Sequence, residues 1–213
     1  MGLDLNPLGK ASAGNEEEFE QLFLDIGISS GDERQKKINR WFEIQLSPYE
    51  TLNTPRIGID KEATNWVLEH FRKPEETSET EEEHIQRYYG QYLPQLTPAS
   101  DGVPIYSNSA INAAAIYSFR GQFIVDDCAE IVGEGIVNRL YTSLLAKDLV
   151  QLGEDLYQVA EQYSKENNVE FTENIATSDA EDKTPELNAH ILFSAAKWCK
   201  FWGSRGHGFE ADY

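Results

Sequence analysis

The sequence predicts a mainly α-helical protein, α+β at most, in which residues 1–213 form a single bundle-like domain. Apolar residues recur at three- and four-residue intervals over most of the chain, which is the pattern of amphipathic helices. Residues that cap helices precede several of these stretches. Alternating segments typical of strands stand at the two ends. We therefore expect roughly seven or eight helices and a small two-stranded element that joins the N- and C-terminal segments.

The two ends of the chain predict the strands. Residues 1–8 (MGLDLNPL) alternate apolar and polar side chains, with Leu3 and Leu5 on one face, until Pro7 interrupts the pattern. Residues 208–213 (GFEADY) alternate in the same way. We expect this second segment to pair with the first.

The first helices are predicted from their starts. Asn15 is the expected cap of the first, because three glutamates follow it where the helix dipole favours negative charge. Ser30 and Glu33 predict a capping box for the second. One side of that helix carries the most basic stretch of the chain, residues 34–40, and Asp60 is expected to cap the next helix. The other side is expected to be buried and presents Ile38, Trp41, Phe42 and Gln45.

The middle of the chain combines an acidic run, an irregular segment and a long apolar stretch. Ser78 and Glu81 predict a second capping box at the end of the run 74–83. Residues 93–108 contain three prolines and are expected to be a loop, which is either a boundary between two subdomains or a functional loop. Residues 109–132 are apolar around much of a helical circumference and predict a long central helix.

The C-terminal half predicts further helices. Gly133 is expected to separate the central helix from a short one. Regular 3,4 spacing of leucines and other apolar residues predicts a helix over 147–164, followed by a flexible acidic segment, 165–183. Thr184 as cap and Pro185 as first residue predict the start of the last helix.

The charge balance limits the classes of partner. The chain has 37 Asp and Glu against 18 Lys and Arg, a formal net charge of -19. Nucleic acid binds proteins by exchanging counterions for Lys and Arg, so direct nucleic-acid binding is not expected. An anionic membrane surface is disfavoured for the same reason.

The cysteines and the absence of targeting segments bear on the compartment. Cys128 and Cys199 lie in apolar helical patterns without metal-binding spacing, so we expect both to be buried, reduced thiols. No N-terminal stretch has the pattern of a signal peptide, and no apolar run approaches the ~18 residues that span a bilayer. The expected location is the cytoplasm.

Short motifs indicate little catalytic chemistry. The common phosphate-binding loops, zinc-protease motifs and nucleophile motifs are absent, and no cofactor is expected. Glu81 and His84 form a Glu-x-x-His pair, the spacing that presents two metal ligands on one side of a helix. Glu186 and His190 lie four residues apart on the last helix and could contribute to a mixed site. The alternative is that such pairs arise by chance on acidic helix surfaces.

Two further clusters are candidates for a catalytic site. Arg120 lies in an otherwise apolar stretch, where it either forms an ion pair, with Asp127 or a distant Glu, or binds an anion. His207 lies between two glycines, with Arg205 and Glu210 nearby in sequence. A His with a carboxylate partner can act as a general base or metal ligand. The alternative is a glycine turn with His207 on the surface, which we favour.

The composition favours binding over catalysis. We expect an acidic protein-binding or inhibitory module that acts on a basic partner, in the manner of an immunity protein, an antitoxin or a nucleic-acid mimic. The expected binding residues are Glu81, Glu82, Glu83 and Tyr89. The alternative is a small helical enzyme or metal-binding protein that uses the His/Glu/Arg cluster near the C-terminus. A third interpretation is that the acidity only keeps the surface solvated.

Overall fold

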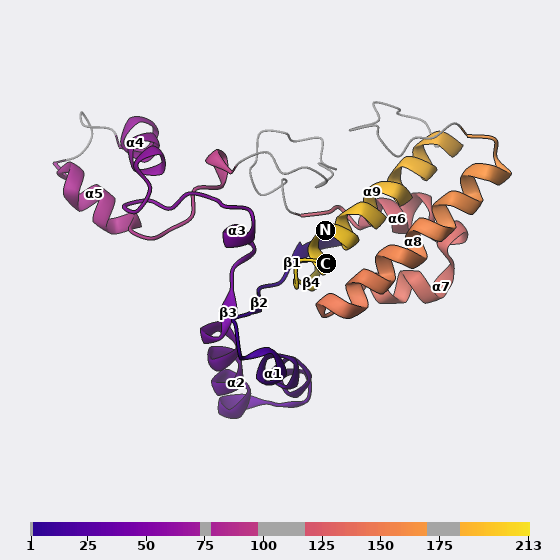
Figure 1. Cartoon of the computed structure of the whole chain (residues 1–213), viewed down its shortest axis with the longest axis horizontal. Helices are drawn as coiled ribbons and strands as arrows, with labels where there is room; N and C mark the ends of the chain where they lie inside the picture. Colours follow the sequence, from indigo (N-terminus) through magenta and orange to yellow (C-terminus); the bar gives the residue numbers. More distant parts are fainter. Residues whose placement is uncertain (1, 73–77, 98–117, 170–183) are drawn as a thin grey trace. The chain divides into compact units, whose positions relative to one another are not determined.

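The computed structural model describes residues 2–72, 78–97, 118–169 and 184–213, which are mainly helical as predicted (Figure 1). Among them, the residues up to Pro48 and from Ser118 onward form one compact unit, unit 1, and those from Tyr49 to Thr97 form a second, unit 2. Unit 1 contains β1 (Asp4–Pro7), β2 (Lys10–Ala11), α1 (Glu16–Ile28), α2 (Gly31–Glu43), β3 (Gln45–Leu46), α6 (Gln122–Asp127), α7 (Ala129–Leu140), α8 (Ala146–Glu166), α9 (Pro185–Gly203) and β4 (Phe209–Asp212). Unit 2 contains α3 (Pro48–Thr51), which starts at the boundary, α4 (Lys61–His70), α5 (Glu81–Tyr88) and the 3-10 helix η1 (Pro94–Leu96).

The predicted pairing of the chain ends is confirmed. β1 and β4 are antiparallel, with Leu5 opposite Ala211 and Pro7 opposite Phe209. Leu5 and Phe209 are fully buried, so each strand contributes a side chain to the core of unit 1. Gly208 precedes β4 where a Cβ would overlap the carbonyl oxygen of Leu144, so no larger residue fits there without movement of the backbone.

The centre of unit 1 is α9, the helix predicted from Thr184 and Pro185. The Thr184 hydroxyl accepts a hydrogen bond from the backbone N–H of Leu187 at 3.2 Å, as an N-cap does. Nearly every residue from Ala189 to Gly203 is buried. α8 lies alongside α9 (Figure 1) and approaches it closely at Gly153, where an added Cβ would lie 2.9 Å from the Cβ of Cys199.

The predicted long central helix over 109–132 is wrong where the structure describes it, from Ser118 onward. Phe119 is not helical but exchanges two backbone hydrogen bonds with Leu5, of 2.8 and 2.9 Å. The helical part is divided into α6 and α7 at Cys128, whose φ is -124°. The apolar residues of this stretch belong to a β-bridge and two short helices, and all of these elements contribute to the core. The periodicity of apolar residues alone does not distinguish this arrangement from one long helix. At Gly133 the φ of 76° interrupts the helix, as predicted.

α1 and α2 form a helical hairpin with an aromatic centre. The rings of Phe19 and Trp41 stack with centroids 5.0 Å apart, and Phe23 packs against the same indole at 6.4 Å. Phe19, Trp41 and Ile44 are buried together. The helix starts agree with the predicted caps in position, although neither cap residue makes a side-chain capping bond.

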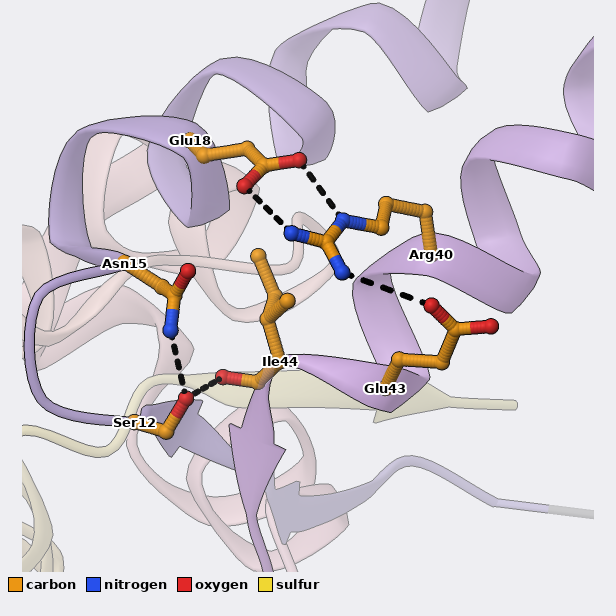
Figure 2. Close-up of polar contacts among 6 residues, drawn as sticks. All are labelled: Ser12, Asn15, Glu18, Arg40, Glu43 and Ile44. Atoms are coloured by element: carbon orange, nitrogen blue, oxygen red, sulfur yellow. Dashed lines mark hydrogen bonds and ion pairs between the residues drawn. The ribbon is translucent and has the colours of Figure 1, made fainter.

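Polar contacts fix the same hairpin (Figure 2). Arg40 of α2 donates two hydrogen bonds of 2.8 Å to the carboxylate of Glu18 on α1. The Ser12 hydroxyl donates to the Ile44 carbonyl at 2.7 Å and accepts from the Asn15 amide at 2.9 Å, so Asn15 uses its side chain on the preceding turn instead of on the helix. The basic stretch predicted over 34–40 is thus partly neutralised within the hairpin.

Unit 2 is built around a small core under α4 and α5. Ile57, Ala63, Val67 and Leu93 are buried in one cluster. α5 begins with a capping box, but Thr80 and Glu83 form it, two residues after the predicted pair Ser78 and Glu81. Both pairs have the required spacing of three residues, so the sequence pattern alone does not select between them.

Two of the predictions fall outside the described residues. Residues 98–108 make up most of the segment where a boundary loop is predicted, and residues 170–183 make up most of the predicted flexible acidic segment. Among the helices that are described, none combines the length and the apolar composition needed to cross a bilayer.

Candidate functional site

His207 is buried, which overturns the prediction that it lies on the surface of a glycine turn. Its side chain has no solvent exposure, and its Nδ1–H donates to the carbonyl of Leu8 at 2.7 Å. The ring meets Trp202 edge-on, with centroids 5.2 Å apart. The pKa of His207 is lowered to about 4, chiefly by burial; the hydrogen bond to Leu8 opposes this shift, and the nearby charges of Lys10 and Arg205 add to it. The neutral imidazole therefore joins the turn after α9 to the N-terminal segment.

Arg205 and Glu210, the residues predicted to assist His207, are engaged elsewhere. The guanidinium of Arg205 lies over the Phe201 ring at 3.7 Å and donates to the Phe201 carbonyl at 3.0 Å. Glu210 is exposed on β4, opposite Asn6. The arrangement does not supply the imidazole with a carboxylate partner at its Nδ1.

Arg120 forms an ion pair, one of the two predicted alternatives, but with a different partner. Its Nη1 lies 2.7 Å from the carboxylate of Asp4 on β1, and both side chains are 38% exposed. The expected partner Asp127 belongs to the end of α6 instead. This pair links β1 to the segment that precedes α6 and gives Arg120 a structural role.

Glu81 and His84, the candidate metal ligands, bind different partners. His84 is 4% exposed, and its Nδ1–H donates to a carboxylate oxygen of Glu79 at 2.9 Å. The other oxygen of Glu79 pairs with Arg87 at 2.7 Å, while Glu81 pairs with Arg72 at 3.5 Å. Within the described ranges, no three or more His, Cys, Asp or Glu side chains are grouped so that they could hold a metal ion.

The second candidate pair and the cysteines lie on or beside the buried helix α9. His190 is 2% exposed, whereas Glu186 is exposed in the first turn of the helix. Cys128 and Cys199 are both free and buried, as predicted. Burial raises the pKa of the Cys199 thiol well above its usual value, so this group stays protonated and unreactive.

The predicted binding residues of α5 are divided between structural and solvent-facing roles. Glu83 accepts a hydrogen bond from the backbone N–H of Thr80, and this bond lowers the pKa of its carboxyl. Glu82 is exposed at the start of the helix. Tyr89 is 57% exposed and packs over Gly58, where its ring leaves no room for a Cβ. Glu82 and Tyr89 remain available to a partner.

An open groove in unit 1 is a concave site that the sequence did not predict. It has a volume of about 690 Å³ and lies between the α1–α2 hairpin, the end of β1, the residues before α8 and β4. Its lining is largely apolar and consists of Pro7, Leu8, Gly9, Phe23, Leu24, Ile26, Gly27, Arg34, Ile38, Trp41, Phe42, Gln45, Thr142, Ser143 and Glu210.

Two polar atoms in the wall of this groove are buried without a hydrogen-bond partner among the described residues. They are the indole Nε1 of Trp41, a side chain only 9% exposed, and the amide Oε1 of Gln45. Gly9 lies so close to Gln45 that a Cβ there would overlap this oxygen. An unsatisfied buried donor or acceptor costs about 1–3 kcal/mol. Both atoms are covered by the surrounding protein and are not accessible from the groove.

The rim of the groove exposes large apolar side chains next to charges. Leu24 of α1 is 62% exposed and Phe42 of α2 is 58% exposed. Glu210 lines the groove from β4 and Arg34 lines it from α2, where its Nε donates to the Ile26 carbonyl at 3.3 Å. The sequence did place Trp41, Phe42 and Gln45 on one helix face. It did not show that the face is incompletely covered, because Glu210 and the residues before α8 reach it only through the fold.

Comparison with known proteins identifies no relative for this chain. No family model, no curated protein and no solved structure matches it.

Proposed function

We propose that the protein is an acidic protein-binding module that recognises a basic polypeptide partner. The proposal is supported by the surplus of negative charge and by the fact that several Lys and Arg side chains are paired with carboxylates of the same chain. The formal net charge is -19. Among the described residues, Lys37, Arg40, Arg72, Arg87, Arg120 and Arg139 each form an ion pair with a carboxylate of the same chain. Each such pair neutralises one positive and one negative charge, so the surplus of carboxylates is left to face solvent or a partner.

The charge surplus selects the class of partner. A strongly negative surface accelerates association with a cationic protein and discriminates against anionic ones. Nucleic acid and anionic lipid surfaces would meet the same repulsion. An inhibitory role, in the manner of an immunity protein or antitoxin, would require that the basic partner be blocked at its own active or nucleic-acid-binding surface.

The contacts favour binding over the alternative of an enzyme that uses the C-terminal His, Glu and Arg. His207 is fully buried and its Nδ1 is committed to the backbone of Leu8. Arg205 is stacked on Phe201. General-base catalysis needs a side chain within hydrogen-bond reach of a substrate, and a buried imidazole with a pKa of about 4 is a poor base.

Affinity capture at two ionic strengths tests the proposal. The full chain is immobilised and exposed to a lysate of the cells that produce it, and an unrelated protein of similar net charge on the same support serves as the control. We expect proteins rich in Lys and Arg to be retained by this chain and not by the control, and to be released as salt screens the interaction. Retained proteins that are neutral or acidic, retention that salt does not change, or no specific retention would contradict the proposal.

A further inference from the structure

The hairpin of α1 and α2 exposes an apolar face. Ile28 is 87% exposed, Leu24 is 62% exposed and Phe42 is 58% exposed. Leu24 and Phe42 line the groove of unit 1, and Ile28 lies one helical turn after Leu24. Gly27 lines the groove as well, and a Cβ added there would meet nothing within 4 Å in the described part of the chain. Exposed apolar side chains that are gathered in this way mark a contact surface.

Each helix contributes a row of three side chains to this face, one of them charged and two of them apolar. Side chains four residues apart lie on the same side of a helix. All three residues of the α2 row line the groove, as does Leu24 at the centre of the α1 row. The rows are Glu20, Leu24 and Ile28 on α1, and Arg34, Ile38 and Phe42 on α2.

Contacts within the hairpin fix how the two rows lie beside each other. The bonds from Arg40 to Glu18 place the end of α2 beside the start of α1. The bond of 3.3 Å from Arg34 Nε to the Ile26 carbonyl places the start of α2 beside the end of α1. The face therefore has three levels along its length, which are Glu20 with Phe42, then Leu24 with Ile38, then Ile28 with Arg34.

A twofold axis makes this face complementary to a second copy of itself. Symmetric dimers bury the same patch on both subunits. An axis that crosses α1 at Leu24 reverses the order of the three levels in the second copy. Glu20 of one copy then lies at the level of Arg34 in the other, and Phe42 of one copy lies at the level of Ile28 in the other. Opposite charges meet at both ends, and apolar side chains meet between the two hairpins.

We propose that the protein forms a homodimer through this face of the α1–α2 hairpin. The net charge of -19 opposes the association of two copies. At physiological ionic strength, however, exposed charges farther apart than about 8 Å are largely screened, whereas charges in contact still interact. The contacts between Glu20 and Arg34 place opposite charges where the copies touch. This inference does not rest on the proposed function.

Sedimentation velocity of the full chain over a range of protein concentrations tests the inference. We expect a monomer–dimer equilibrium at ~0.15 M salt. Ile28→Glu is expected to weaken dimerisation about tenfold or more, because a symmetric dimer buries the new charge twice. The matched control is Ile59→Glu, since Ile59 is also an exposed isoleucine, at 55%, but belongs to unit 2. This control is expected to dimerise as the natural chain does.

Charge reversal provides a second, independent test. Glu20→Arg reduces the net negative charge of each copy, so a general electrostatic effect would strengthen association. Loss of the contact with Arg34 would instead weaken it, and this is the expected result. Adding Arg34→Glu to the same chain restores opposite charges at both ends and is expected to restore dimerisation. The control is Glu62→Arg, an exposed reversal on α4 that is not expected to weaken the dimer.

The outcomes decide between this interface and its alternatives. Circular dichroism unchanged from the natural chain verifies that each variant is folded. A natural chain that is monomeric at every concentration would overturn the inference. A dimer that Ile28→Glu and Ile59→Glu weaken equally, or that neither weakens, would overturn it as well. A Glu20→Arg chain that associates more strongly, or that Arg34→Glu does not rescue, would likewise overturn the proposed pairing of the two copies.

Discussion

Acidification is predicted to destabilise unit 1 through His207. The folded chain holds this imidazole neutral down to a pKa of about 4, whereas the unfolded chain takes up the proton near the ordinary value of 6.5. Between these two pH values the unfolded state binds more protons, so stability falls as pH decreases from about 6.5 and levels off below about 4. The shift corresponds to a loss of about 3 kcal/mol in the free energy of unfolding.

Urea denaturation followed by tryptophan fluorescence, at a series of pH values, measures this loss. The acidic residues also titrate in this range, so the comparison is between the natural chain and His207→Asn, whose amide can still donate to the Leu8 carbonyl. The natural chain is expected to lose about 3 kcal/mol more than the variant between pH 6.5 and 4. Parallel pH profiles would show that His207 does not cause the loss. If the variant does not fold, an NMR titration of the natural chain decides, and a His207 midpoint near 6.5 would show the same.

Two further predictions concern stability. Gly153→Ala is expected to destabilise the α8–α9 contact by about 1–3 kcal/mol in thermal unfolding, because the new Cβ would lie 2.9 Å from that of Cys199. The control is Gly135→Ala, where an added Cβ meets nothing within 4 Å. This control variant is expected to be neutral or stabilising in the same measurement. Thr80→Ala is expected to cost about 1 kcal/mol by removing the capping box of α5, while Ser78→Ala costs nothing measurable. The Thr80 and Ser78 variants are compared by urea unfolding. Equal losses of stability in the two glycine variants would contradict the close packing at Gly153, and equal losses in the Thr80 and Ser78 variants would contradict the capping box at Thr80.

Local patterns in the sequence predicted much of the fold. The alternation at both ends predicted the β1–β4 pair, and Thr184 with Pro185 predicted the start of α9. These features are set by neighbouring residues: side-chain alternation within a strand, and a hydroxyl within reach of the backbone N–H of the third residue of a helix. Information of this kind is contained in a few consecutive residues.

Features that depend on distant contacts were not predicted. Phe119 pairs with Leu5 through the backbone, and no pattern around Phe119 distinguishes that role from a helical one. His207 is buried, and it contacts Leu8 and Trp202, which lie elsewhere in the sequence or on the preceding helix. Two glycines in the sequence indicated a turn correctly but carried no information about what covers it.

The groove shows the same limit for the candidate site. Trp41, Phe42 and Gln45 were predicted on one face of a helix that should be buried. The structure buries Trp41 but leaves Phe42 58% exposed, because Glu210 and the residues before α8 approach this face without covering it. The polar Gln45 was the one departure from the apolar pattern of this predicted face.

The central claim, that this is an acidic module for a basic partner, is tested most directly by affinity as a function of ionic strength. The measurement is the Kd between the full chain and a protein that it retains, by surface plasmon resonance at increasing salt. We predict that the Kd rises steadily with salt, chiefly through slower association. A Kd that does not change with salt, or a partner that carries no surplus of Lys and Arg, would contradict it.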